Sequence, residues 1–348
     1  MSGLARLLLP AGLCSHPPPE GIVGAMSAAH RRVGPGDGPT VSDVLARMGA
    51  VAQGAADEGR AFVNGRRAAP GDPVREGDEV AVWAARREDD AAGRVEVLAR
   101  WGDILVAFKP APLPTTPDRR GTRSLVTDLA ARLGLREPPH AASRLDVGVS
   151  GAVLCAAGPR GARHLTAMRE AGRIARVYVG IASAAVEGEG VWAAPIGRAR
   201  AAGGHRVPAA GGAGAKEAAT RYRAIARAGG AAGGSGATAA TLLRLEPITG
   251  RMHQLRVHAA HAGAPLLGDR EHGGARAVVD RGGRVTAVAR IALHALAVTV
   301  PDERGAARTA VAPVPDDLRA IWKVLDGDDA AWEEVGASSA PAGATPTP

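Results

Sequence analysis

Short apolar runs of strand length fill the chain from residue 95 to 322, and their order constrains the fold more than any other feature. They lie between turn residues, at 104–108, 152–156, 174–182, 220–227, 242–246 and 292–300. Helical patterns are fewer and occur irregularly among them, at 124–135, 160–171 and 251–263. A parallel α/β sheet would need a helix after nearly every strand. The order therefore predicts an α+β domain with a mixed, largely antiparallel central sheet.

A smaller pattern precedes this domain. Apolar residues at 41, 44, 45 and 48 have helical spacing, and residues 61–66 read as a strand that enters an Asn-Gly turn. A second turn and strand follow at 75–83. Residues 40–84 thus resemble the small alpha-L RNA-binding module of ribosomal protein S-four. The alternative is a purely structural β-hairpin domain, because the helical half has few cationic side chains for RNA phosphates.

The remaining segments mark the boundaries. Residues 1–39 are rich in Gly, Pro and Ala without periodicity, which predicts a disordered leader. Residues 85–94 are charged and are expected to be a linker. Residues 336–348 are rich in Ala, Ser, Pro and Thr and are expected to form a disordered tail. The larger domain then spans residues 95–325.

Charge and cysteine content narrow the class of partner. The formal net charge of +8 favours an anionic partner, nucleic acid before membrane, although an arginine-rich composition also follows from a GC-rich genome. The two cysteines, Cys14 and Cys155, form neither a disulfide framework nor a zinc motif. The apolar run at 4–14 is too short to span a membrane. We expect a cytoplasmic monomer that binds RNA and not a membrane.

Two segments carry candidate chemistry. The run S-R-L-D-V-G-V-S-G over residues 143–151 places Asp146 in a short turn. A carboxylate in this position can act chemically on a nucleoside, either by attacking the glycosidic carbon of its sugar or by removing a proton from that sugar. The alternative is a structural role, in which the aspartate only accepts hydrogen bonds from the backbone of its own turn. The second segment, T-G-R-M-H-Q-L-R-V-H over residues 249–258, sets cationic and amide side chains at the start of an expected helix.

Helical geometry distinguishes the residues of this second segment. Met252, Leu255, Ala259 and Ala262 share one stripe and are the expected core face. Arg256 lies at the edge of that stripe, where a buried guanidinium needs a partner such as Asp146. At the expected helix start, arginine 251 can meet a phosphate together with free backbone N–H groups.

Both segments resemble the motifs of RluA-type pseudouridine synthases, usually His-Arg-Leu-Asp-x-x-Thr-Ser-Gly and Gly-Arg-Thr-His-Gln-Ile-Arg-x-His. The strand at 104–108 followed by Lys109-Pro110, and the P-I-G-R turn at 195–198, also resemble that family. The resemblance covers about residues 95–322. It implies the family's bent sheet with an RNA cleft, and isomerisation of uridine to pseudouridine in structured ribosomal or transfer RNA, without a cofactor.

The resemblance also implies residue roles. Asp146 would be catalytic and Arg256 would pair with it; Tyr178, within A-R-V-Y-V-G, would stack on the extruded uracil. Without the family, a half-buried sheet residue is the better interpretation of that tyrosine. The other candidates for contact with RNA are Arg144, Arg251 and Lys109, whereas His253 and Gln254 are expected either to shape the pocket or to contact the RNA. For Lys109, a phosphate contact and a solvent-facing position are equally good predictions.

The chain departs from the family pattern at polar positions. Ser143, Val149 and Met252 replace the usual histidine, threonine and threonine, and Phe108 replaces the usual asparagine. These changes sustain one alternative, a non-catalytic RNA-binding or ribosome-assembly protein with the same fold. A metal site from histidines 253, 258 and 261 is not predicted, because no cysteine or carboxylate stands at zinc-like spacing.

Overall fold

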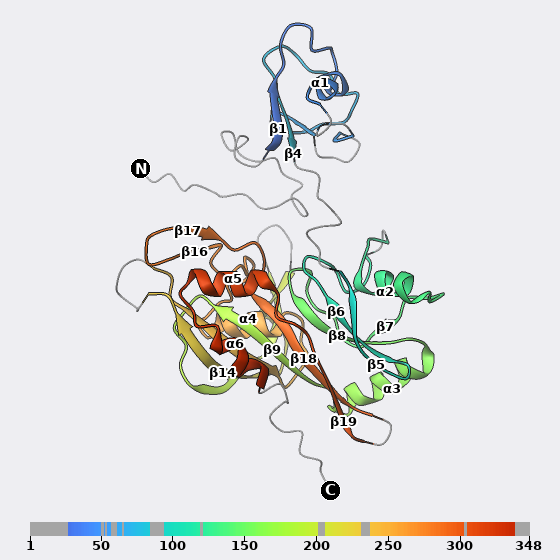
Figure 1. Ribbon diagram of the computed structural model, residues 1–348, viewed down its shortest axis with the longest axis vertical. Coiled ribbons are helices and arrows are strands. Elements are labelled where there is room, and N and C mark those ends of the chain that lie inside the picture. The colour runs from blue at the N-terminus through green and yellow to red at the C-terminus, as the bar shows by residue number, and fades with distance from the viewer. Residues whose placement is uncertain are drawn as a thin grey trace. The chain divides into compact units, whose positions relative to one another are not determined.

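The structure is a computed structural model that describes residues 27–49, 52, 54–56, 61–64, 66–83, 94–118, 121–200, 206–230, 237–302 and 305–337. The chain forms two compact units, Met1–Ala91 and Ala92–Pro348, which Figure 1 colours from blue to red along the sequence. Among the helices of the described ranges, none is long and apolar enough to cross a membrane.

The first unit packs one helix against a four-stranded antiparallel sheet of order β1-β4-β2-β3. Thr40 caps the helix in a capping box with Asp43. The expected helix and hairpin are both present, and Asn64 takes the positive φ of 47° that the turn needs. The elements are α1 (Val41–Arg47), β1 (Ser27–Arg32), β2 (Ala61–Val63), β3 (Arg66–Arg67) and β4 (Glu79–Trp83).

Strand β1 corrects the expected boundary at residue 40. It lies inside the segment 1–39 that was predicted to be a disordered leader. The strand has no alternating apolar pattern, and it is held by backbone pairing to β4 from Ser27↔Trp83 to Arg32↔Glu79. Such pairing leaves no signal in composition. The expected leader at residues 1–26 and most of the expected linker at 85–94 lie outside the described residues.

The second unit is built on a ten-stranded sheet with the path β10-β14-β15-β9-β18-β8-β6-β5. Strand β19 joins β18, and β7 joins β8. The strands are β5 (Glu96–Trp101), β6 (Ile104–Lys109), β7 (His140–Ala141), β8 (Ser150–Ala156), β9 (Ala175–Ala182), β10 (Glu189–Ala193), β14 (Ala219–Ala228), β15 (Ala240–Pro247), β18 (Leu293–Pro301) and β19 (Ala307–Val311). The predicted mixed, largely antiparallel sheet is confirmed.

Strand β18 lies between the two halves of this sheet. It runs antiparallel to β9 and parallel to β8, where His294 pairs with Ser150 and Ala295 with Gly151. Gly151 has a φ of 124°, and a Cβ there would collide with the backbone of Ala295. Only glycine fits both requirements, so this residue allows β8 and β18 to approach each other.

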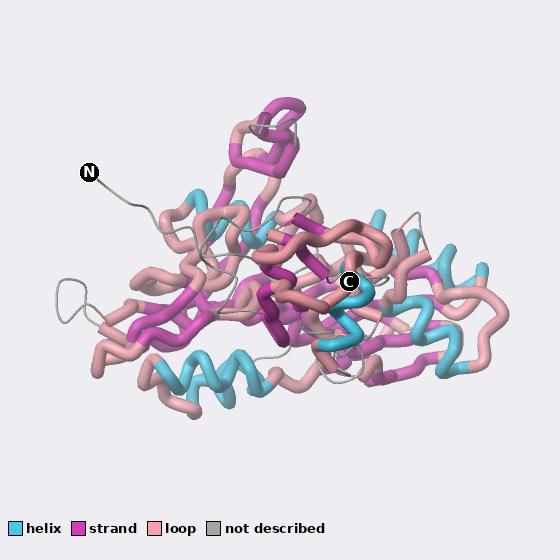
Figure 2. Tube along the Cα trace, turned by 90° about the horizontal axis from the view of Figure 1, so that it is seen from above, coloured by secondary structure: helices cyan, strands magenta, loops and turns pink. Residues whose placement is uncertain are grey.

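Alternating side chains cover the two faces of the sheet. On β9, Tyr178 packs into the core that contains Leu255, whereas Val177 and Val179 pack into the core that contains Trp322. Helices α2 (Leu125–Leu133) and α4 (Gln254–His261) cover the first face; α3 (Pro159–Glu170), α5 (Asp316–Val324) and α6 (Ala330–Ala337) cover the other. Figure 2 shows these helices in cyan flanking the magenta strands.

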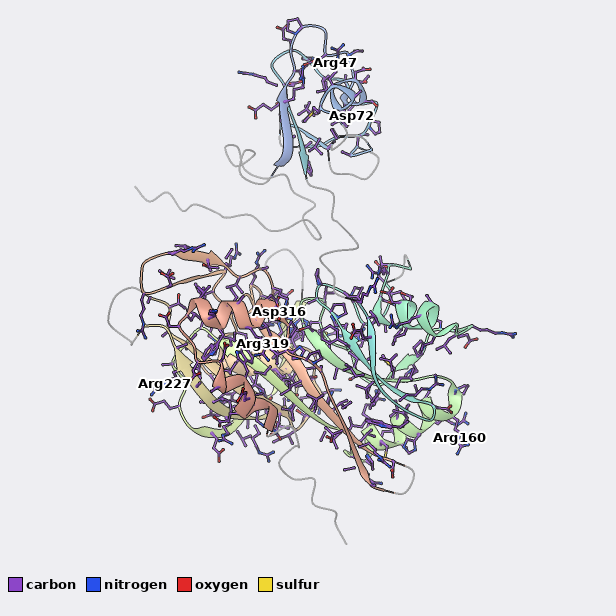
Figure 3. All side chains as sticks on the ribbon, viewed as in Figure 1. Arg47, Asp72, Arg160, Arg227, Asp316 and Arg319 are labelled. Atoms are coloured by element: carbon purple, nitrogen blue, oxygen red, sulfur yellow. The ribbon has the colours of Figure 1, made fainter. Side chains whose placement is uncertain are left out.

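Helices α5 and α6 pack against each other through aromatic side chains. Trp322 and Trp332 make an edge-to-face contact at 6.4 Å, and Arg319, labelled in Figure 3, lies over the Trp332 ring at 5.6 Å. Helix α6 extends the unit to residue 337, beyond the expected end at 325 and into the first residues of the expected tail. The rest of that tail, 338–348, lies outside the described residues.

Two small sheets lie outside the main one. The segment 199–214 is rich in Gly, Ala and Arg, which predicts a loop, but its described residues, 199–200 and 206–214, contribute to a three-stranded sheet of order β12-β11-β13. Its Gly-, Ala- and Arg-rich sequence has no apolar alternation, and the backbone pairing with β11 supplies the order. These strands are β11 (Ile196–Arg200), β12 (Arg206–Ala210) and β13 (Ala213–Lys216); β16 (Ala277–Val279) and β17 (Val285–Ala287) form a separate hairpin.

Candidate active site

Asp146 lies in the loop between β7 and β8, and two contacts fix that loop. The hydroxyl of Thr115 accepts from the backbone N–H of Leu145 and donates to its carbonyl oxygen, both at 3.0 Å. The N–H of Val149 donates to the carbonyl oxygen of Asp146 at 3.0 Å and closes the turn. The backbone thus holds the turn although Val149 has no hydroxyl, and the Asp146 side chain remains 30% exposed.

Arg256 meets this carboxylate from helix α4. Its Nη1 donates to Oδ2 of Asp146 at 2.8 Å, although the arginine side chain is only 4% exposed. The partner that a buried guanidinium needs at this position is therefore Asp146, as the helical pattern predicts. One charged side chain is buried and fixed, and the other reaches solvent.

A glycine-rich loop after α4 holds the rest of the guanidinium. Asp269, which is fully buried, accepts from Nε of Arg256 at 2.8 Å and from Nη2 at 2.7 Å. Glu271 accepts from the same Nη2 at 2.8 Å. This bidentate pair and the third carboxylate fix the plane of the guanidinium, so the nitrogen that faces Asp146 has a defined position.

The same groups set the charge of Arg256. Burial alone would lower the pKa of its guanidinium, but the hydrogen bonds and charges of Asp269 and then Asp146 outweigh burial and raise the pKa. The arginine is therefore charged at any physiological pH. Three carboxylates therefore share this one guanidinium.

His253 stands between two of these carboxylates. It is the residue before the first turn of α4 and has a left-handed backbone, with φ 53° and ψ 20°. Its Nε2 lies 3.6 Å from Oδ1 of Asp146, and its Nδ1 lies 3.5 Å from Oε2 of Glu271. The ring also contacts His272 edge-on, with centroids 5.7 Å apart. The structure thus brings His253 to Asp146, as expected for a residue that shapes this site.

Tyr178 points to the same face of the sheet but is buried in the core. Burial raises the pKa of its phenol, Arg176 opposes that shift through its charge and a hydrogen bond, and the charge of Asp146 adds to it. The phenol is thus within electrostatic reach of Asp146. Its ring face is covered by protein, so contact with a base requires local movement.

Lys109 does not occupy either of its expected environments. The side chain at the end of β6 is fully buried, and its ammonium donates to the carbonyl oxygens of Pro110, Leu113 and Val147 at 3.1, 2.5 and 3.4 Å. Burial lowers its pKa to about 7, as does the charge of Arg290, while Asp146 opposes the shift. A buried ammonium held by carbonyl oxygens cannot contact a phosphate. Lys109 instead supports the Asp146 loop through its contact with the carbonyl of Val147.

Gln254 is likewise a structural residue. Its Oε1 accepts from the Thr249 hydroxyl at 2.6 Å and from the N–H of Arg251 at 3.0 Å. Its Nε2 donates to the carbonyl of Ala219 at 2.9 Å and to the hydroxyl of Thr220 at 3.0 Å. These four bonds use the capacity of a buried amide, which leaves none for RNA.

The start of α4 differs from its sequence prediction. The helix begins at Gln254, so Arg251 precedes it; its Nε donates to the carbonyl of Glu217 at 3.0 Å, and the side chain is exposed. Met252, expected on the core face, is 53% exposed for the same reason. Arg144 is exposed beside Asp146 in the loop. Both arginines therefore remain accessible to a polyanion.

Sequence reasoning missed Thr115, Asp269, Glu271 and His272. The last three stand in L-G-D-R-E-H-G-G over residues 267–274, a glycine-rich turn with two acidic residues shortly after the motif helix. Gly268 has a φ of 74°, and a Cβ there would meet the Arg290 backbone. Acidic residues in a turn that demands glycine are a signal that could have found this loop. Thr115 has no comparable signal.

Comparison with known proteins identifies the family. The family model for RNA pseudouridylate synthase matches residues 103–261. Ribosomal large subunit pseudouridine synthase D of Xanthomonas campestris is 31% identical over 295 residues, which are 80% of this chain and 84% of that relative. The chain belongs to the RluA-type RNA pseudouridine synthases. An uncharacterised RNA pseudouridine synthase of Zymomonas mobilis is also 31% identical, and the alignment covers 61% of this chain and 90% of that relative.

A solved structure agrees on the fold of the synthase. The human RNA pseudouridylate synthase domain containing 1 aligns with a TM-score of 0.54 at 21% identity, and the alignment covers 72% of this chain and 97% of that one. The family match and the 31% identity to synthase D show that the protein is an isomerase that converts uridine to pseudouridine in RNA. The alternative of a non-catalytic protein with this fold is not favoured. The family match lies within the second unit and leaves the first unit without an assignment.

Proposed function

We propose that Asp146 is the catalytic group of this synthase and that Arg256 positions it. One observation carries the proposal: the Asp146 carboxylate, 30% exposed, is bonded at 2.8 Å to a guanidinium that is 4% exposed and is itself held by the fully buried Asp269. Such an arrangement fixes a reactive carboxylate while leaving it open to a large substrate.

The geometry supports a division of work between the two carboxylate oxygens. Oδ2 accepts the hydrogen bond from Arg256, whereas Oδ1 lies 3.6 Å from the nearest ring nitrogen of His253, beyond hydrogen-bond distance. Oδ1 is therefore the atom that would meet the ribose. Attack on the glycosidic carbon and removal of a sugar proton both begin with this oxygen. Neither step needs an electron or energy donor.

We propose that the target uracil, once it is extruded from the RNA, contacts Tyr178. The phenol faces the side of the sheet that α4 covers and is within electrostatic reach of Asp146. An aromatic face accepts any base by stacking, which is worth about 1–3 kcal/mol. Rotation of the base within the site demands such a contact, since the base is free of the sugar between bond cleavage and bond formation.

For the substrate, we propose large-subunit ribosomal RNA in the cytoplasm. Relatives at about 30% identity carry the name ribosomal large subunit pseudouridine synthase D. Residues 1–91 contain 10 arginines and 12 acidic residues, a net charge of −2, so residues 92–348 carry +10. The cationic surface that an RNA requires is thus on the catalytic unit, with exposed arginines 144 and 251 near the site.

We propose that the first unit contributes to the choice of target. Its helix and hairpin match the pattern of the alpha-L module, which supports an RNA contact. Its net negative charge argues against a large electrostatic contribution to affinity. Recognition of RNA shape by a few contacts is the role that fits both facts.

The test is a pseudouridine map of total RNA from cells that carry either the natural gene or Asp146→Asn. The amide keeps the size of the side chain but can neither attack carbon nor take a proton, so we expect one or a few sites in large-subunit ribosomal RNA to disappear. Sites lost from transfer RNA instead would correct the substrate. An unchanged map would refute the catalytic role of Asp146.

A matched control separates chemistry from charge. Asp316→Asn removes an exposed carboxylate from the first turn of α5, labelled in Figure 3, on the face of the sheet opposite α4. We expect this variant to keep the wild-type map. Circular dichroism and thermal unfolding of both purified variants would show that each retains the fold.

A further inference from the structure

Three potential metal ligands converge beside Asp146. They are His253 at the start of α4 and Glu271 and His272 in the loop that follows it. One donor atom from each lies within 4.8 Å of the other two. The three side chains come from two segments that Arg256 already ties together.

The donors suit a borderline divalent cation. Two imidazole nitrogens and one carboxylate oxygen form a set that Zn²⁺ binds in proteins, with bonds of about 2.0–2.1 Å. In a tetrahedral site such bonds place neighbouring ligand atoms about 3.4 Å apart. Nδ1 of His253 lies 3.5 Å from Oε2 of Glu271, which also accepts from Nη2 of Arg256 at 2.8 Å, so the other oxygen, Oε1, is the one that would turn to the metal.

Two of the ring nitrogens are buried without a hydrogen-bond partner. They are Nδ1 of His253 and Nε2 of His272. A buried polar atom with no partner carries a cost in free energy that a bound cation would remove.

The local charge also favours a cation. Asp146, Asp269 and Glu271 place three carboxylates around one guanidinium. Glu271 is 52% exposed, so its side chain has room to turn one oxygen to a metal while the other remains near Arg256. The ion would complete its coordination with water from the exposed side.

We propose that His253, Glu271 and His272 form an inhibitory binding site for Zn²⁺ or a similar divalent cation. A metal on Nδ1 of His253 would leave the proton on Nε2, which faces Oδ1 of Asp146 at 3.6 Å. A short movement then makes a carboxylate–histidine–metal triad, the usual outer partner of a metal-bound histidine. The oxygen that meets the ribose would be occupied, and catalysis would stop. This control goes beyond the isomerase activity itself.

Binding is tested first, without RNA, so that the result does not depend on the role of Asp146. Untagged, full-length protein treated with EDTA and dialysed is titrated with ZnCl₂ by calorimetry. We expect one ion per chain at this site, with affinity about tenfold or more lower in His272→Ala and Glu271→Gln. The matched control is His261→Ala, an exposed histidine on α4. It should bind as the wild type does.

Two kinds of result would overturn the proposed metal site. Absence of saturable binding, or equal affinity of wild type and His272→Ala, would overturn the site. Loss of binding in His261→Ala alone would do the same. Mg²⁺ should not compete, because it prefers an octahedron of oxygen ligands. Thermal unfolding of each metal-free variant checks that the fold is retained.

Inhibition is tested second, as the ratio of rates with and without Zn²⁺ for each protein. We expect ZnCl₂ to slow the wild type and His261→Ala, with recovery on adding EDTA, and to leave the ratio for His272→Ala near one. Binding without inhibition of the wild type would overturn the inhibitory role. Equal inhibition of His272→Ala would show that the ion acts through RNA or another site, and would overturn it as well.

Discussion

His294 is fully buried on β18, and its Nδ1 lies 2.9 Å from the hydroxyl of Ser150, the first residue of β8 after the Asp146 loop. Burial lowers its pKa to about 3, from an ordinary value of 6.5. Between these pH values the unfolded chain binds a proton that the folded chain does not. The free energy of unfolding therefore falls as the pH drops from 6.5 towards 3.

We expect His294→Gln to weaken this dependence on pH, because glutamine can still bond Ser150 but does not titrate. Urea unfolding at pH 7 and pH 4.5 measures it: the loss of stability between the two should be smaller in the variant than in the wild type. The control is His140→Gln, an exposed histidine on β7, which should lose as much as the wild type. If His294→Gln loses as much stability between pH 7 and pH 4.5 as the wild type does, His294 is not the group that causes the pH dependence.

At this scale the sequence predicts some contacts and misses others for a physical reason. The pairing of Arg256 with Asp146 follows from a charge at the edge of an apolar stripe, and the structure contains it. The environments of Lys109 and Gln254 depend on carbonyl and hydroxyl groups from distant segments, such as Val147 and Ala219. Local periodicity has no information about those groups. The catalytic role of Asp146 itself stays a prediction.

Among the elements, the junction of β8 and β18 has the strictest requirement. A methyl group at Gly151 would meet the backbone of Ala295, and the φ of 124° already disfavours any other residue. We expect Gly151→Ala to destabilise the protein by about 3 kcal/mol or more and to reduce activity through the adjacent Asp146 loop. Thermal unfolding and a single-turnover assay measure both effects.

The variant Gly172→Ala separates the steric clash from the conformational cost of a positive φ. That glycine also has a positive φ, 67°, but a Cβ there meets nothing within 4 Å. We expect it to lose only about 1 kcal/mol, the conformational part, and to keep its activity. Similar losses in the two variants would mean that the close approach of β8 and β18 contributes little.

Elements with their own apolar pattern are predicted well, and those held by partners are not. Strands β6, β9, β15 and β18 and helices α2 and α3 lie within one or two residues of their predicted places. Strands β1, β12 and β13 were missed because backbone pairing with a neighbour, not burial of alternate side chains, defines them. Helix α4 was predicted three residues too early, since His253 takes a left-handed conformation that no local pattern indicates.

The two units have separate cores in the described parts of the chain. One apolar cluster draws its members from residues 33–82, and the clusters of the second unit draw theirs from residues 95–335. The positive charge belongs to the second unit. We therefore expect residues 92–348 to fold alone, to turn over a short RNA that holds the target uridine, and to bind RNA with an unchanged dependence on salt.

The same truncation should lose selectivity between the target and an RNA of equal length with another structure. Filter binding at several salt concentrations, with both RNAs and both proteins, measures this. If selectivity survives truncation, the first unit has no part in choosing the target. If the salt dependence weakens instead, that unit supplies phosphate contacts that its net charge does not indicate.

The position of β18 also has a consequence for synthesis on the ribosome. Strands β8 and β9 both pair with β18, which is made more than one hundred residues after them. Until translation passes residue 301, the emerging chain holds two unsatisfied sheet edges and a loop that carries Asp146. A nascent enzyme of this design completes its reactive centre only after β18 has been made, so shorter nascent chains would expose these edges to aggregation and would lack activity.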